Sequence, residues 1–236
     1  MQRPSKYMKA ALNEEPGREY TEFPLDFYHL VWIFTICSFA GLVVETVVSY
    51  PIDGVWKDRA GLVWGPLSPI YGLAAVLFTV ILNPLRHKRL TVLFAVSAFA
   101  GGFFEFVAGW FWESAFGIVA WSYADQPFNV MGHTCLGISL VWGLAGFVWL
   151  KLLLPVVYDL IDHIPTRIQQ TLATALAVFL AVDVAFTIAA FTCWFDRQTG
   201  EPVDTQFQAF FAEHFDDEFM SERFQTMSIY PCLAKR

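Results

Sequence analysis

Charged side chains are scarce in this 236-residue sequence, since only 16% of the residues are Asp, Glu, Lys or Arg while 56% are hydrophobic. Soluble domains contain about 25% charged residues, so this composition excludes an ordinary soluble domain. Basic patches of the kind that bind nucleic acids are also missing, and we expect no nucleic-acid partner. The sequence therefore predicts a polytopic membrane protein that has the lipid bilayer as its surroundings.

Motifs for hydrolysis and for nucleotide binding are absent as well. The chain has no GxSxG or HExxH motif, no SxxK motif with partners, and no Walker A phosphate loop. We therefore favour a protein that is not an enzyme, and any ATP-driven function requires a separate ATPase subunit. The four cysteines form no CxxC motif and no Cys/His metal spacing, so we predict no cofactor and no metal site.

Long apolar stretches predict an all-α transmembrane bundle of about five spans within residues 26–195. The expected helices cover residues 26–50, 66–85, 90–116, 129–154 and 171–195. Residues 1–25 read as a polar N-terminal arm without a signal peptide. Residues 196–236 hold eight acidic residues and an aromatic pattern close to helical spacing. They predict an acidic, amphipathic tail that rests on the protein or on the membrane interface.

A short phrase occurs twice in the apolar part of the chain. Residues 34–45 read FTICSFAGLVVE and residues 94–105 read FAVSAFAGGFFE, and alignment at an offset of sixty superimposes two Phe, one Ala, Gly41 on Gly101, and Glu45 on Glu105. We interpret this as two helix–loop–helix repeats at residues 26–85 and 90–154, followed by the fifth helix. Two repeats of this kind have the same orientation in the membrane.

The carboxylates of the repeated phrase are the main functional signal. A carboxylate that faces lipid costs about 2.5–3.5 kcal/mol on insertion scales, so Glu45 and Glu105 predict a paired, inward-facing polar site. Asp53 and Glu113 each follow eight residues later. Between the repeated elements, GPLSPIYG at residues 65–72 predicts an irregular helix start, which is tolerated at membrane depth only where it is buried or lines a cavity.

The distribution of Lys and Arg predicts the orientation. The turn at residues 86–89 is the densest basic segment, whereas the loop at residues 117–128 has no Lys or Arg. We therefore place the N-terminus in the cytoplasm of a multi-pass cell-membrane protein and the C-terminal tail outside. Arg59 lies in an outer loop against this bias, which predicts a specific partner, either Glu45 or Glu105. An outside tail also allows a disulfide between Cys193 and Cys232.

On this topology, the polar and aromatic residues that gather in the outer half of the membrane predict an outward-facing vestibule for a small molecule or ion. The candidate substrate-binding residues are Glu45, Arg59, Ser68, Tyr71, Glu105, Glu113, Tyr123, His133 and Trp142.

Each candidate also has a structural interpretation. Glu45 with Arg59 can be an ion pair that only holds the loop, Glu105 can hydrogen-bond only to a neighbouring helix, and His133 can be a helix-start or packing residue. A metal bound by Glu45, Glu105 and His133 is a minor alternative because their spacing is open. Asp183 in the fifth helix is a weaker candidate that could pair with Ser139.

Several segments together resemble the putative ABC-transporter type IV, or CmpB-like, membrane family. They are the FxGxxxE pattern of the first helix, DRAGLVWGPLSPIYG at 58–72, FAGGFFE at 99–105, WSYADQPFNVMGHTCLG at 121–137 and the late FDDEFM segment. The resemblance covers residues 30–230 and implies an integral membrane permease of five to six helices. The family usually shows Asn-Arg-Gly where this chain has Asp58-Arg59-Ala60, and often a Cys near Ser68 and an Arg near His133.

Two functions follow from these observations. The first is a transporter or permease component that binds a solute or ion between the two repeats, with a homo-oligomer left open. The second is a non-transporting binding, sensor or scaffold protein, or a membrane-embedded enzyme that acts on a lipid-like substrate.

Overall fold

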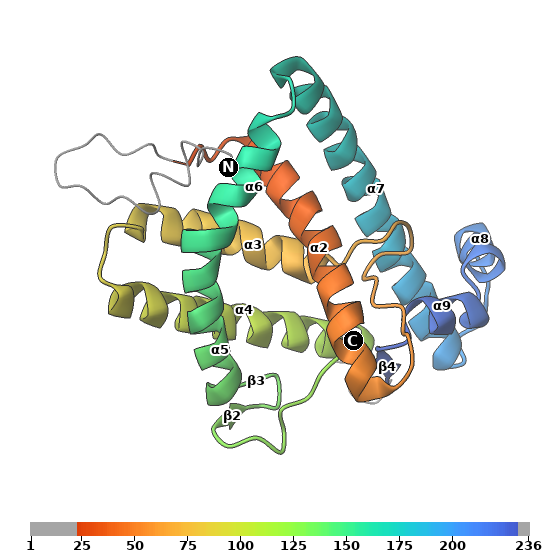
Figure 1. The fold of residues 1–236 in the computed structure, drawn as a ribbon. Coiled ribbons are helices and arrows are strands. Elements are labelled where there is room, and N and C mark those ends of the chain that lie inside the picture. The colour runs from red at the N-terminus through yellow and green to blue at the C-terminus, as the bar shows by residue number, and fades with distance from the viewer. Residues whose placement is uncertain (1–22, 231–236) are drawn as a thin grey trace.

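The computed structural model of the chain describes residues 23–230, and Figure 1 shows that long helices dominate it. Among these residues, four helices are long and apolar enough to cross a membrane: α2 (Phe27–Asp53), α4 (Leu90–Phe116), the continuous helix Leu136–Asp162 and α7 (Thr166–Gln198). The shorter apolar helix α3 (Pro69–Leu82) continues into the 3-10 turn η1 (Asn83–Leu85). The prediction of an all-α polytopic bundle is thus confirmed. Most of the predicted arm at 1–25 lies outside the described residues.

Helix α2 begins and ends at recognisable signals. The Asp26 side chain accepts hydrogen bonds from the amides of Tyr28 at 3.0 Å and His29 at 3.2 Å, which satisfies two of the free donors of the first turn. The predicted end at Tyr50 was early, because the helix continues through Pro51 to Asp53. It stops at Gly54, whose φ of 71° is a left-handed conformation that glycine adopts readily.

The fourth long helix lies further along the chain than the prediction of 129–154. Residues 129–135 instead form a tight hairpin, in which β2 (Asn129–Val130) pairs with β3 (Thr134–Cys135) around Gly132 at φ 75°. The helix then runs as α5 (Leu136–Val148), the π-helical turn η2 (Trp149–Leu153) and α6 (Leu154–Asp162). Pro155 does not end it, because proline is tolerated in the first turn that follows η2. The fifth helix, in contrast, starts earlier than predicted, at Thr166 rather than at residue 171.

The C-terminal tail folds back onto the helices. It forms two short helices, α8 (Gln206–His214) and α9 (Asp217–Arg223), rather than one. The division occurs at Asp216, whose side chain accepts from the Phe219 amide at 2.8 Å and so begins a new helix. The strand β4 (Ser228–Ile229) then pairs antiparallel with β1 (Ile118–Val119), directly after α4.

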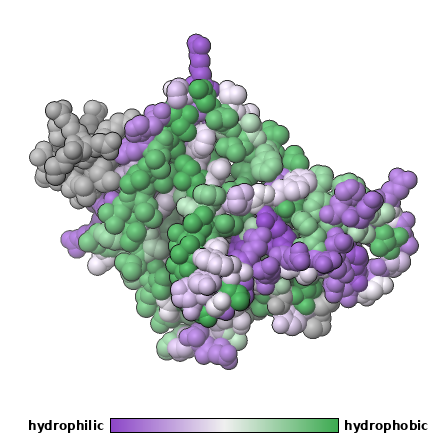
Figure 2. Space-filling view, turned by 45° about the vertical axis from the view of Figure 1, so that its right-hand side comes forward, coloured by the Kyte–Doolittle hydropathy of each residue, from purple (hydrophilic) through white to green (hydrophobic). Residues whose placement is uncertain are grey.

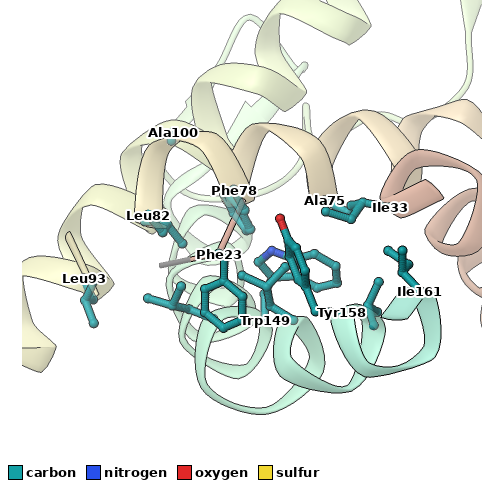
Figure 3. Packing of buried hydrophobic residues seen from close by; sticks show 13 residues of the cluster. Phe23, Ile33, Ala75, Phe78, Leu82, Leu93, Ala100, Trp149, Tyr158 and Ile161 are labelled. Atoms are coloured by element: carbon teal, nitrogen blue, oxygen red, sulfur yellow. The ribbon is translucent and has the colours of Figure 1, made fainter. Parts of the chain in front are cut away.

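The two largest hydrophobic clusters of the described residues lie at opposite ends of the long helices. The first joins the start of α2, the end of α3 and the region η2–α6, and Figure 3 shows the rings of Phe23, Trp149 and Tyr158 packed inside it. The second joins the end of α7 and the end of α4 to the tail. Its buried residues from the tail are Phe211, Phe215, Met220 and Phe224.

Apolar side chains also cover much of the outside of the molecule. Figure 2 shows hydrophobic residues over the long helices, whereas hydrophilic residues gather on the side of the C-terminal helices α8 and α9. Exposed apolar residues on a single helix include Val43, Val44, Val47 and Val48 of α2. Contiguous apolar surface of this extent is what a lipid bilayer covers.

Candidate functional site

The segment between α2 and α3, residues 54–68, reaches deep along the helices. Its end is fixed where the Ser68 amide donates to the Ser38 carbonyl of α2 at 3.1 Å. Ser38 lies roughly 20 Å below Asp53, at about 1.5 Å of rise per residue. This segment is therefore irregular backbone at membrane depth, and its residues Ala60, Leu62, Val63 and Leu67 are buried.

Helix α7 and the tail satisfy the backbone of this segment. The Val63 amide donates to Thr187 Oγ1 at 3.0 Å, and the Trp64 amide donates to Asp183 Oδ1 at 3.2 Å. From α9, Arg223 donates to the carbonyls of Leu62, at 2.9 Å, and Gly65. These bonds explain how a non-helical segment is held at this depth, since backbone groups without partners are costly away from water.

Removing the Arg223 side chain should loosen this segment. Arg223 also binds Asp58 Oδ2 at 2.7 Å, so Arg223→Ala removes three contacts to residues 58–65. We expect a loss of about 1–2 kcal/mol and faster amide hydrogen exchange in residues 58–65. Glu222→Ala, at an exposed neighbouring position, is the matched control. Unchanged exchange in Arg223→Ala would show that the tail does not hold the segment.

The first polar cluster forms around Glu45 of α2. Arg59 donates to Glu45 Oε1 at 2.8 Å and to Asp53 Oδ2 at 2.7 Å, and the Tyr71 hydroxyl of α3 donates to Glu45 Oε2 at 2.7 Å. Lys57 lies 3.4 Å from Asp53. The predicted partner of Arg59 is thus Glu45. The cluster contains two carboxylates and two cations, so its charges balance.

The second polar cluster forms around Glu105 of α4. Tyr123 donates to Oε1 at 2.8 Å, while Trp142 of α5, at 3.2 Å, and Thr134 of β3, at 3.5 Å, donate to Oε2. Glu105 is only 7% exposed. All three donors are neutral, so this cluster differs from the first in having no cation to balance its carboxylate.

The two clusters are built in the same way. Glu45 and Glu105 occupy matching positions of the repeated phrase, and each accepts a hydrogen bond from an aromatic side chain of the next helix, Tyr71 or Trp142. One turn earlier on each acidic helix, Gly41 contacts the Tyr71 side chain and Gly101 contacts the Trp142 side chain so closely that a Cβ would collide. Glycine lets the aromatic residue lie flat against the helix and reach the carboxylate.

Tyr71 of the first cluster and Tyr123 of the second lie within electrostatic range of each other. Among the described residues, no hydrogen bond joins the two clusters directly. Burial, and then the hydrogen bond to Glu105, raise the pKa of the Tyr123 hydroxyl above its usual range. Tyr123 therefore remains a neutral hydroxyl that can both donate and accept a hydrogen bond.

The remaining predicted residues lie beside the clusters. His133 is buried, with Nδ1 3.9 Å from Glu113 Oε2, and its ring packs edge-on against Phe106. Ser68 is buried at the start of α3, where its amide binds the α2 backbone. Within residues 23–230, no group of three or more His, Cys, Asp or Glu side chains is placed to hold a metal.

Sequence reasoning missed several contributors. Asp183 does not pair with Ser139 as predicted, because it binds the Trp64 amide while Ser139 donates to the Cys135 carbonyl at 2.9 Å. Asp183 and Thr187 are one turn apart on an apolar helix, and this spacing was an available signal of a shared partner. No local signal linked Arg223 to a segment so far away in the sequence. Cys193 is a buried free thiol, and its predicted partner Cys232 lies outside the described residues.

These features define a multi-pass helical membrane protein. A family model described as Putative ABC-transporter type IV matches residues 32–188, more than half of the chain. The chain belongs to that family, which confirms the resemblance seen in the sequence. Neither a curated protein nor a solved structure matches the chain.

Proposed function

We propose that the protein is a transporter or permease component that binds a small solute or ion in a polar vestibule between two structural repeats. The supporting observation is the pair of matching carboxylates, each held by an aromatic donor from the following helix. Carboxylates placed in apolar helices at equivalent positions are typical of a transport pathway. The vestibule is formed by the clusters of Glu45 and Glu105, with His133, Glu113 and Ser68 at its border.

We further propose that the N-terminus faces the cytoplasm and the tail faces outside the cell membrane. The support is that Arg86, Lys88 and Arg89 lie at one end of α4, whereas the tail pairs with β1 at the other end. The positive charges of Lys57 and Arg59 no longer oppose this orientation, because both contact acidic side chains. A separate ATPase subunit would then dock at the cytoplasmic ends of the helices.

Solute uptake into proteoliposomes tests the proposal. The probes are labelled choline, glycine and methanesulfonate, which carry a positive charge, both charges and a negative charge. We expect choline or glycine to be taken up above protein-free liposomes, because the clusters together hold more carboxylates than cations. Glu45→Gln and Glu105→Gln should each lower this uptake at least about tenfold, equal to roughly 1.4 kcal/mol.

The control is Asp125→Asn, which changes an exposed loop carboxylate and should leave uptake unchanged. Full uptake in both Glu45→Gln and Glu105→Gln would contradict the proposed site. Binding of a probe without any uptake would instead favour the non-transporting receptor or sensor, and would overturn the transporter proposal. The same vesicles therefore separate the two functions.

A further inference from the structure

The surroundings of Glu105 are unusual for a carboxylate inside a membrane helix. Its side chain is buried, and within residues 23–230 every hydrogen bond that it makes comes from a neutral donor: Tyr123, Trp142 or Thr134. Glu45, its counterpart, has the Arg59 guanidinium at 2.8 Å. The charge of one carboxylate is therefore balanced within the protein, while that of the other is not.

The negative charge of the Glu105 carboxylate is shielded from water, so a bound cation or proton has to balance it. A metal ion needs several oxygen or nitrogen ligands, and the described part of the chain offers no cluster of three or more acidic, His or Cys side chains for one. A larger organic cation, such as a solute held elsewhere in the vestibule, needs direct access to the carboxylate, but the Glu105 side chain is buried against its hydrogen-bond donors. A proton needs only one lone pair.

The cage around Glu105 suits both the ionised and the protonated state. Trp142 and Thr134 donate to Oε2, which accepts hydrogen bonds both as a carboxylate oxygen, where they are stronger, and as the carbonyl oxygen of the acid. Tyr123 donates to Oε1 in the ionised state. When a proton binds Oε1, the Tyr123 O–H rotates away and its oxygen accepts from the new carboxylic acid. Trp142, Thr134 and Tyr123 therefore each keep a hydrogen bond to Glu105 in both states.

The titratable groups on the neighbouring elements are few. They are Tyr123 in the loop between α4 and the hairpin, His133 and Cys135 at the hairpin, Glu113 on α4 itself, and Tyr71 on α3, which interacts with Tyr123. The Nδ1 atom of His133 lies 3.9 Å from Glu113 Oε2, so the imidazole is oriented toward that carboxylate. None of these groups supplies Glu105 with a permanent cation.

We propose that Glu105 is a proton-binding site and that Tyr123 is its positioning residue, which orients the proton between Glu105 and the Tyr71–Glu45–Arg59 cluster. This inference rests on the proposed function, because it identifies the proton as the ion that the vestibule binds and releases. In each cycle one proton adds to Oε1 and the same proton leaves, so no other bond is made or broken.

Infrared difference spectroscopy of the full chain in lipid vesicles, titrated from alkaline to acidic buffer, tests this site without any transport. We expect a carbonyl band of a protonated, buried carboxylic acid that shifts in deuterated buffer. The band should be lost in Glu105→Gln and retained in Glu45→Gln. A wild-type titration without the band, or a band retained in Glu105→Gln, would overturn the proposal.

Tyr123→Phe provides a second test should Glu105→Gln fail to fold. The substitution removes one hydrogen bond to the ionised carboxylate, so Glu105 should take up its proton at a pH higher by about one to two units. Tyr71→Phe removes the corresponding bond at Glu45 and should leave this midpoint unchanged. Equal midpoints in the wild type and Tyr123→Phe would contradict the role of Tyr123. A normal titration without solute uptake would instead refute only the transporter function.

Discussion

Replacing Arg59 with alanine is expected to destabilise the protein by about 3 kcal/mol. The guanidinium bridges Glu45 and Asp53 at 2.8 and 2.7 Å, so its removal leaves two carboxylates without this cation. The three side chains are between 15% and 30% exposed. Solvent therefore screens the remaining charges less than it does at an open surface, where an ion pair contributes about 0–1 kcal/mol.

Unfolding in mixed detergent micelles, followed by circular dichroism, measures this loss. Lys57→Ala is the matched control, because Lys57 contacts the same Asp53 at 3.4 Å but is 36% exposed, and it should cost less than about 1 kcal/mol. Adding Glu45→Gln to Arg59→Ala should recover part of the loss, since it removes one unbalanced charge. Losses of the same size for Arg59→Ala and Lys57→Ala would show that Arg59 is not the bridge.

Replacing Gly101 with alanine is expected to lower the free energy of unfolding by about 2–3 kcal/mol. A Cβ at Gly101 would collide with the Cβ and Cγ atoms of Trp142 and would lie 2.8 Å from its Cδ2. The side chain of Trp142 cannot yield at its Cβ without moving the backbone of α5. The displacement would also weaken the bond from Trp142 to Glu105, so proton binding at Glu105 should change together with stability.

Gly137→Ala is the control for Gly101→Ala. Gly137 also lies in a membrane helix, but a Cβ there would meet only Cys135 Sγ at an ordinary 3.7 Å. The higher helix propensity of alanine should make this variant neutral or more stable, by up to about 1 kcal/mol. Gly41→Ala should be destabilised as much as Gly101→Ala, because a Cβ at Gly41 would collide with the Tyr71 side chain. Equal unfolding temperatures for Gly101→Ala and Gly137→Ala would contradict the close contact between Gly101 and Trp142.

The repeated phrase was the strongest guide to the candidate site. It pointed to Glu45 and Glu105 because a carboxylate in an apolar helix is costly wherever it faces lipid. The imbalance of Lys and Arg also led to the pairing of Arg59, which the structure confirms with Glu45. Neither signal indicated that Arg59 would balance only one of the two carboxylates, since that depends on which loop reaches which helix.

Helix boundaries were predicted less well than helix positions. The sequence placed the fourth helix at 129–154, followed by a polar segment at 155–170. The structure forms a hairpin over the first residues and continues past Pro155 through a π-helical turn. Both differences depend on local hydrogen bonds that hydrophobicity does not encode.

By itself, the sequence determined that this chain is a helical membrane protein with two carboxylates placed in apolar helices, at matching positions of a repeated phrase. Long apolar runs and isolated charges have large transfer free energies, and these are properties of single segments. Only the tertiary structure decided how the segment 54–68 is held by α7 and α9, and why Glu105 is left with neutral donors while Glu45 receives Arg59. Such contacts join residues that are distant in the chain, and their geometry follows from packing rather than from any local pattern.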